Sequence, residues 1–134
     1  MGLEYRMALI GVGIDLVDVS DAERLLVRWG ERLLQRVLTE DERVYVLSHD
    51  LPEKHLAVRL AAKEAVYKAF GSLPEARGVG WRDIEVMREG NGRPWVRLHG
   101  LAARLAEQEG PLNVSLSLSH TSRTAGAVAV IERL

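Results

Sequence analysis

The longest regular pattern in the sequence covers residues 53–70, EKHLAVRLAAKEAVYKAF, and it is the strongest helix signal in the chain. Asp50 and Glu53 have the spacing of a capping box, and Pro52 falls in the first turn, where proline fits a helix. Gly71 follows the last turn as a natural stop. We therefore predict one long helix, with the other segments arranged around it.

The remaining segments favour short strands and short helices. Residues 8–19, ALIGVGIDLVDV, are rich in Ile, Val and Gly, which predicts a strand that its glycines allow to run close to another segment. Residues 84–98 alternate around an Asn-Gly turn, and residues 113–119 and 124–131 flank a second turn, so two hairpins are predicted.

Capping signals mark the helices between these strands. Ser20 begins one helix, which Gly30 breaks or bends, and Thr39 with Glu42 begins the next. A short helix is expected over residues 100–109. The order is a strand, three helices, a hairpin, a helix and a hairpin. It predicts an α+β fold, with a largely antiparallel sheet packed with one long central helix.

Composition agrees with one compact domain covering residues 1–134. Hydrophobic residues make up 47% of the chain and charged residues 28%, as in ordinary globular domains. The absence of Cys excludes a disulfide scaffold and a Cys nucleophile, and fits a reducing cytoplasm. A net charge of −1 gives no general attraction to nucleic acid or acidic membranes. We expect no membrane helix, which needs ~20 apolar residues, and no secretory signal.

One local charge pattern departs from this balance. Arg28, Arg32 and Arg36 recur every four residues, with Arg24 one turn earlier, so on a helix they form a basic ridge. Such a ridge is either a solvated helix face or a docking surface for an acidic macromolecule. The spacing alone leaves both interpretations open.

Two acidic residues are candidates for chemistry. Asp15 ends an apolar strand, where a carboxylate needs a cation or several donors unless it simply caps a local turn. On the long helix, Glu64 shares a stripe with Lys68, one turn away, beside a row of alanines. Spacing alone favours an exposed Glu-Lys pair, whereas the alanines favour a close-packed, partly buried face.

Serines and histidines give a weaker pattern. Ser115, Ser117 and Ser119 share one face of a predicted strand that ends in His120, but adjacency in sequence does not make a catalytic triad. The histidines lack zinc-ligand spacing. Two carboxylates with Arg, Lys and His nearby would suit Mg²⁺ bound to a phosphate, because Mg²⁺ takes few protein ligands. The same residues also fit a folded domain without such chemistry.

Six motifs follow one another along the chain. They are Gly11-Val-Gly-Ile-Asp15, Leu38-Thr39 with Glu42, Arg59-Leu-Ala-Ala-Lys-Glu-Ala-Val-Tyr-Lys-Ala-Phe-Gly71, Asp83-Ile-Glu-Val, Asn91-Gly-Arg-Pro94 and Ser117-Leu-Ser-His120. In order and approximate spacing they resemble the holo-acyl-carrier-protein synthase family, the small 4′-phosphopantetheinyl transferases, from about Ala8 to Leu134. The long-helix block combined with the upstream aspartate is the most specific part.

The resemblance implies a Mg²⁺-dependent transferase that moves 4′-phosphopantetheine from coenzyme A to a serine of apo acyl carrier protein, for fatty acid biosynthesis. The other product is adenosine 3′,5′-bisphosphate. Asp15 and Glu64 would bind the metal, and Lys68 would contact phosphate and support the chemistry. Arg59 and His120 would hold phosphates of CoA. The serine proton could go to Glu64, to a metal-bound water or to Lys68, and the sequence does not choose.

The resemblance also implies partners. Because acyl carrier proteins are acidic, the ridge of Arg24, Arg28 and Arg32 becomes the candidate docking surface. Family members of this size form homotrimers with the active site between subunits. The sequence departs from the family at Asp21, where Arg is frequent, and in the altered loop of residues 72–80. A binding domain without catalysis and an inactive structural subunit are the alternatives, and retention of every metal and phosphate position argues against the second.

Overall fold

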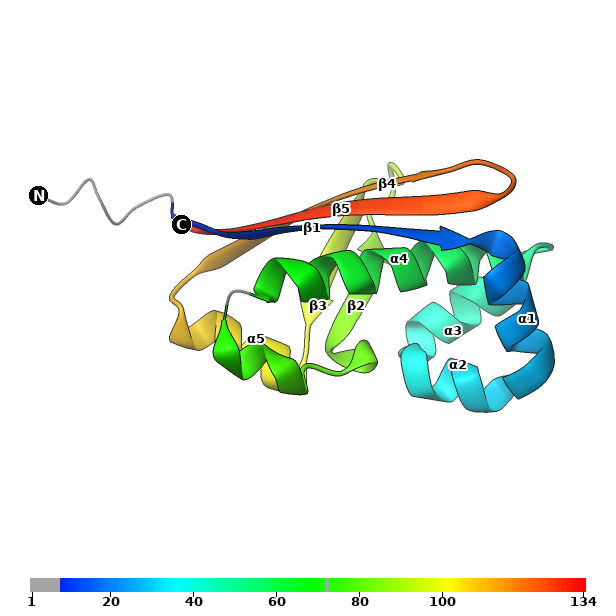
Figure 1. Cartoon of the computed structure of the whole chain (residues 1–134), viewed down its shortest axis with the longest axis horizontal. Coiled ribbons are helices and arrows are strands. Elements are labelled where there is room, and N and C mark those ends of the chain that lie inside the picture. The colour runs from blue at the N-terminus through cyan, green and yellow to red at the C-terminus, as the bar shows by residue number, and fades with distance from the viewer. Residues whose placement is uncertain (1–7, 72) are drawn as a thin grey trace, which may run out of the picture.

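The computed structural model describes residues 8–71 and 73–134 (Figure 1). A long helix runs along a three-stranded sheet, and the shorter helices lie on the same side of that sheet. The predicted α+β class is confirmed. In chain order the elements are β1 (Leu9–Asp18), α1 (Val19–Trp29), α2 (Glu31–Val37), α3 (Glu40–Leu47), α4 (Pro52–Phe70), the 3-10 helices η1 (Pro74–Gly78) and η2 (Trp81–Asp83), β2 (Ile84–Arg88), β3 (Pro94–Leu98), α5 (Gly100–Gln108), β4 (Leu112–His120) and β5 (Thr124–Arg133).

The strands form two antiparallel sheets rather than one. In the larger sheet β5 lies between β1 and β4, and in the smaller sheet β2 pairs with β3. The first strand of the chain therefore pairs with the last. Helices cover only one face of the larger sheet (Figure 1). The predicted hairpins are confirmed, whereas the single sheet divides because the β2–β3 hairpin pairs only with itself.

α4 occupies the predicted central position. It begins at Pro52 and ends at Phe70, and the predicted stop at Gly71 is confirmed. Asp50 is not its cap, because Leu51 holds the N-cap position without a side-chain hydrogen bond. Pro52 at the start has no N–H that would need a cap. Neither α4 nor any other helix in the described residues is long and apolar enough to cross a membrane.

β1 lies unusually close to α4, as its glycines predict. A Cβ atom on Gly13 would lie 1.8 Å from the carbonyl oxygen of Ala65, and one on Gly11 would lie 2.1 Å from that of Ala69. Only glycine permits this contact. Because Gly11 meets Ala69 and Gly13 meets the earlier Ala65, the strand and the helix run antiparallel.

The shorter helices follow the capping signals in part. Asp18, not the predicted Ser20, holds the N-cap position of α1, so Ser20 lies inside the helix. Gly30, with a φ of 53°, separates α1 from α2, which confirms the predicted break. The capping box at Thr39 is also confirmed: its hydroxyl accepts from the Glu42 N–H, and the Glu42 carboxylate accepts from the Thr39 N–H.

Two apolar clusters follow each other along α4, one on its C-terminal part and one on its N-terminal part. The first packs α4 against the larger sheet, β2 and α5, around Phe70, Ile84 and Ile131. The second packs it against α1, α2 and α3, around Leu38 and Leu56. Because both parts of the helix are covered, only a narrow stripe of its surface stays accessible.

The contact between β1 and α4 can be tested with Gly13→Ala. The added methyl would overlap a backbone carbonyl, so we expect the free energy of unfolding to fall by about 2–3 kcal/mol in urea denaturation. Gly90→Ala is the control, because nothing lies within 4 Å of a Cβ there, and its effect should stay within about 0.5 kcal/mol. Equal effects of the two changes would contradict the close contact.

Candidate functional site

The accessible stripe of α4 meets β1 near Asp15, which lies inside the strand and not at its end as predicted. After its first turn, the only residues of α4 that are not buried are Glu64, Tyr67 and Lys68. The Lys68 ammonium lies 3.1 Å from Oδ1 of Asp15 and donates to the Ile14 carbonyl at 3.0 Å. The Asp15 side chain is 19% exposed and that of Lys68 is 49% exposed. An ammonium has three hydrogens, so one remains for a ligand.

Glu64 belongs to the same region. Starting from the contact of Gly13 with Ala65, the antiparallel course of β1 and α4 places Asp15 beside the turn of α4 that carries Glu64. Glu64 makes no hydrogen bond or ion pair with another described residue. The exposed Glu64–Lys68 pair is not formed, because Lys68 turns to Asp15 instead.

A slot of about 160 Å³ opens beside Glu64, between α4 and the segment that carries η2. Tyr67, Val79, Trp81 and Ile84 give it largely apolar walls. A free carboxylate next to apolar and aromatic walls suits a ligand that has both an ionic and an apolar part.

The donor set fits Mg²⁺ held jointly with a phosphate. Asp15 and Glu64 supply carboxylate oxygens, the ligands that Mg²⁺ prefers. No group of three or more His, Cys, Asp or Glu side chains gathers as a metal site within the described part of the chain. Two carboxylates suffice for Mg²⁺, because water and substrate phosphates complete its shell, whereas zinc held by protein alone needs more ligands.

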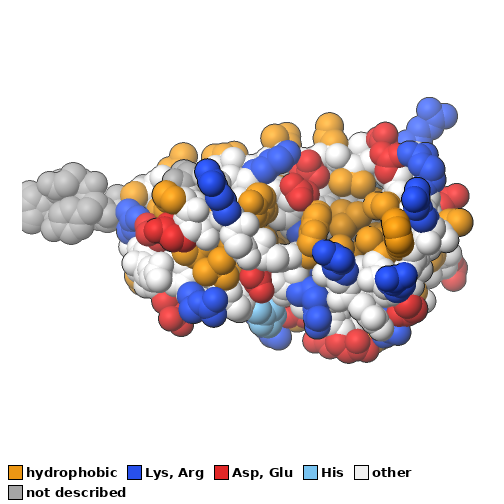
Figure 2. All heavy atoms as spheres, turned by 60° about the horizontal axis from the view of Figure 1, so that its bottom comes forward, with side chains coloured by type: hydrophobic (Ala, Val, Ile, Leu, Met, Phe, Trp, Pro, Cys, Tyr) orange, Lys and Arg blue, Asp and Glu red, His pale blue; other side chains and the backbone are white. Residues whose placement is uncertain are grey.

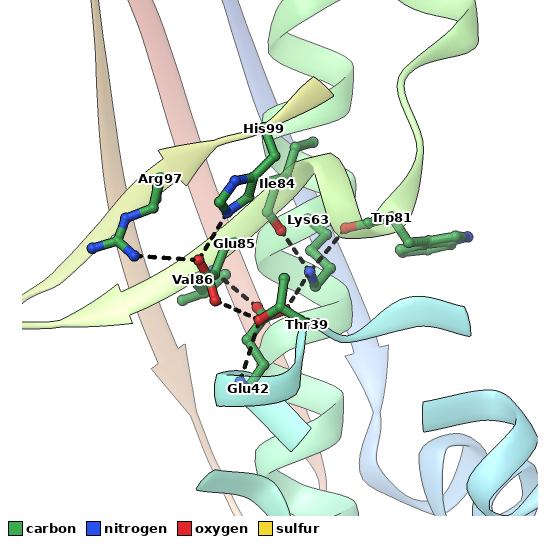
Figure 3. Close-up of polar contacts among 9 residues, drawn as sticks. All are labelled: Thr39, Glu42, Lys63, Trp81, Ile84, Glu85, Val86, Arg97 and His99. Carbon is green, nitrogen blue, oxygen red and sulfur yellow. Dashed lines mark hydrogen bonds and ion pairs between the residues drawn. The ribbon is translucent and has the colours of Figure 1, made fainter. Parts of the chain in front are cut away.

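A buried ion pair supports the wall of the slot (Figure 3). The Lys63 ammonium donates to Oε1 of Glu42 at 2.7 Å, to the Trp81 carbonyl at 2.9 Å and to the Ile84 carbonyl at 2.5 Å. Both side chains of the pair are 1% exposed. Burial lowers the pKa of Lys63, and the charge of Glu42 opposes that shift. All three ammonium hydrogens are therefore paired, and they join α3, α4 and the start of β2.

A second carboxylate extends this network (Figure 3). Glu85 accepts a hydrogen bond of 2.5 Å from the Thr39 hydroxyl, and Nε2 of His99 lies 2.9 Å from its other oxygen. Burial disfavours the charged form of Glu85. Hydrogen bonds from Thr39 and His99, with the charges of His99 and Arg97, outweigh burial and lower the pKa of Glu85 below its ordinary value. An ionised Glu85 thus ties β2 to the start of α3.

Arg59 does not reach the Asp15–Lys68 pair. Its side chain is buried, and the guanidinium lies 4.1 Å from the centroid of the Tyr45 ring on α3. Its Nε and Nη1 atoms have no hydrogen-bond partner in the described part of the chain. Burial lowers the pKa of Arg59, and burial with nearby positive charges lowers the pKa of His55 to about 4. His55 is therefore neutral near pH 7, beside the Arg59 guanidinium.

His120 is likewise separate from Asp15 within one chain. It is exposed at the end of β4, and the order of strands puts β4 about 10 Å from β1, two strand spacings away. Ser115, Ser117 and Ser119 are all exposed, which confirms that they share one face of the strand.

The uncovered face of the larger sheet is apolar along β1 and β5. Val12, Ile14 and Leu16 of β1 are 56%, 61% and 70% exposed, and Val128 of β5 is 39% exposed. We call these four residues the outer sheet face. A contiguous exposed apolar patch of this kind marks an interaction surface.

The basic ridge is divided between two helices by the break at Gly30. Gly30 ends α1 after Arg28, and Arg32 and Arg36 belong to α2. Hydrophobic side chains gather in a hollow toward the end of the molecule that carries α1 and α2, with basic side chains around it (Figure 2). The α1–α2 surface is defined by Arg24, Leu25, Arg28, Trp29, Arg32 and Arg36.

Sequence reasoning missed the buried pair and the slot. It assigned Glu42 only to a helix cap, although the same carboxylate also holds Lys63. The available signal was the position of Lys63 directly after two alanines, one turn after Arg59, on the side of the helix that packs. No pattern indicated that Trp81, at the start of η2, would line the slot.

Comparison with known proteins gives the family. Residues 11–128 match the model of the 4′-phosphopantetheinyl transferase superfamily, a range that contains Asp15 and all of α4. The chain belongs to this family.

Named relatives narrow the comparison. The holo-[acyl-carrier-protein] synthase of Moorella thermoacetica is 44% identical over 127 residues, covering 92% of this chain and 94% of the relative. The synthase of Serratia proteamaculans is 40% identical over 126 residues, which cover 94% of this chain and 99% of the relative. The crystal structure of the Neisseria meningitidis holo-[acyl-carrier-protein] synthase has a TM-score of 0.81 at 30% identity, covering 93% and 99%. A Bacillus anthracis synthase in complex with CoA (3′,5′-ADP) has a TM-score of 0.76 at 30% identity, covering 96% and 99%.

Lys63→Met tests the buried pair. The change leaves the Glu42 carboxylate buried without its cation, so we expect a loss of about 3–5 kcal/mol in the free energy of unfolding. Adding Glu42→Gln should recover part of that loss, because it removes the uncompensated charge. Lys54→Met on the same helix, outside any ion pair of the described residues, is the matched control. A loss no larger than that of the control would contradict the role of the pair.

Proposed function

We propose that this chain is a holo-[acyl-carrier-protein] synthase that moves 4′-phosphopantetheine from coenzyme A to a serine of apo acyl carrier protein, for fatty acid biosynthesis. Adenosine 3′,5′-bisphosphate is the second product. Family membership and relatives that match nearly end to end support this function. The observation that carries it is the Asp15–Lys68 pair beside an unpaired Glu64, on adjoining parts of β1 and α4. We take residues 1–134 as one transferase domain, and its Cys-free composition suits the cytoplasm.

Positioning and charge neutralisation account for most of such a transfer. Mg²⁺, when held by Asp15 and Glu64, would neutralise charge on the pyrophosphate of CoA. Lys68 is held by Asp15 and the Ile14 carbonyl, and its remaining hydrogen would bond a phosphate oxygen. The carrier serine oxygen forms a bond to the β-phosphorus while the bond to the bridging oxygen breaks, so the bisphosphate leaves with the electron pair.

Glu64 is our candidate for accepting the serine proton. Its carboxylate has two oxygens, so one would hold Mg²⁺ while the other accepts the proton, and neither bonds to another described residue. The Lys68 ammonium already acts as a donor in two contacts, which favours its role as a cation rather than a base. The slot beside Glu64 would take the part of CoA next to the transferred phosphate.

Arg59 and His120 remain our candidates for binding other phosphates of CoA. The two unpaired nitrogens of Arg59 support an anion there, although its buried side chain has to move to reach one. His120 is exposed and accessible. The α1–α2 surface, with Arg24, Arg28 and Arg32, would dock the acidic carrier protein, because its charge is complementary.

We further propose a homotrimer with the active site between subunits. The outer sheet face is an apolar area that no described residue covers, and burying it between copies removes it from water. His120 lies two strands away from Asp15 in one chain, and we propose that His120 of a neighbouring copy completes the site instead.

Asp15→Asn and Glu64→Gln test the chemistry. Each removes a carboxylate charge at similar size, so we expect the transfer rate to fall by at least about 100-fold. The assay follows the mass of an apo acyl carrier protein incubated with CoA and Mg²⁺. Glu107→Gln, on the exposed side of α5, is the control and should transfer normally.

The same assay separates transfer from mere binding. A domain that only binds an acidic protein would give a salt-sensitive complex, no bisphosphate and no mass shift. That result, or full activity in both carboxylate variants, would contradict the proposed function.

Leu16→Lys tests the trimer. A charge on the most exposed apolar side chain of the outer sheet face should prevent association, so light scattering should report a mass near 14.9 kDa. We expect transfer to be lost with it. Val44→Lys, an exposed apolar residue on α3, is the matched control and should leave a mass three times as large. Equal masses for wild type and Leu16→Lys would overturn the role of this face.

A further inference from the structure

One arginine of the α1–α2 surface is already paired in the free protein. The Arg24 guanidinium forms an ion pair with Asp21, one turn earlier on α1. Their side chains are 72% and 50% exposed, so both ends of the pair face solvent. The pair lies in the groove that also contains Arg28 and Trp29.

The other arginines of this surface carry no acidic partner among the described residues. Arg28 lies 5.1 Å from the centroid of the Trp29 ring, a contact that leaves its charge uncompensated. Arg32 and Arg36 form no ion pair, in contrast to Arg43 on α3, which pairs with two glutamates. Asp21 therefore neutralises one arginine of this surface and leaves the rest available.

The paired arginine is the one nearest the proposed reaction. α1 follows β1 without a loop, so Asp21 and Arg24 lie in its first two turns, shortly after Asp15. Arg28 lies one turn farther along, near the C-terminal end of the helix. A partner that rests in the groove of α1 therefore meets the Asp21–Arg24 pair at the end of the helix that follows β1.

We propose that Asp21 is a specificity-determining residue, because its carboxylate competes with acidic side chains of the incoming carrier protein for Arg24. This inference rests on the proposed function, because it takes the α1–α2 surface as the carrier's docking site. Docking of an acidic segment has to displace Asp21, which weakens binding to carriers that are acidic at this point. The affinity for a carrier with a neutral side chain opposite Arg24 is not lowered by this competition.

The expected size follows from the exposure of the pair. Exposed ion pairs contribute little to stability, so Asp21 can be displaced at small cost, and the fold does not depend on it. Removing its charge frees Arg24 and lessens repulsion of an acidic partner. We expect Asp21→Asn to lower the KM for an acidic apo acyl carrier protein about three- to five-fold, with the change in KM rather than kcat.

The experiment compares three variants with the wild type. Glu23→Gln is the matched control, because it removes the same charge from the same helix while Glu23 pairs with no described residue. The double variant Asp21→Asn/Arg24→Gln should lose the gain, because the freed arginine is absent. Binding of the apo carrier is also measured by fluorescence anisotropy without CoA, at low and high salt. The gain should shrink as salt screens the charges.

Each outcome decides the inference. A lower KM and tighter binding for Asp21→Asn alone support the competition. An equal gain with Glu23→Gln, or a gain that survives in the double variant, overturns it, because net charge would then explain the effect. If no protein transfers phosphopantetheine, the proposed function fails, and anisotropy still shows whether Asp21 competes for Arg24.

Discussion

The close contact between the backbone of β1 and the small-residue face of α4 is the constraint on which the rest of the structure depends. Gly11 and Gly13 let the strand lie directly on Ala65 and Ala69. At that separation Lys68 reaches both Asp15 and the Ile14 carbonyl, and the turn with Glu64 lies beside the strand. The candidate site is therefore a consequence of backbone packing, and each of its charged groups comes from an element that the contact fixes.

Much of this fold could be predicted, because its signals are local. The long helix, its stop at Gly71 and the capping box of Thr39 follow from short-range spacing. Ser20 and Asp50 were predicted as N-caps, but Asp18 and Leu51 hold those positions. The backbone conformation of the preceding segment decides where a helix begins, and side-chain type alone does not specify it. The pairing of the first strand with the last is long-range, and no local pattern specifies it.

The pairing within the candidate site could be predicted in part. A carboxylate in an apolar strand requires a partner, and the structure gives Asp15 the ammonium of Lys68. Arg59 could not be placed from sequence, since the same residue type serves on a surface or over a buried ring. The Lys63–Glu42 pair joins residues 21 positions apart, and only the packing of α3 on α4 brings them together.

The wall of the slot is assembled before any ligand arrives. The Lys63 ammonium donates all three of its hydrogens, to Glu42 and to the carbonyls of Trp81 and Ile84. A shift of the backbone at Trp81 or Ile84 would leave a buried ammonium hydrogen without an acceptor. A molecule that binds beside Glu64 therefore contacts a preorganised wall. The entropic cost of ordering this wall is met when the protein folds. It therefore does not reduce the free energy of ligand binding.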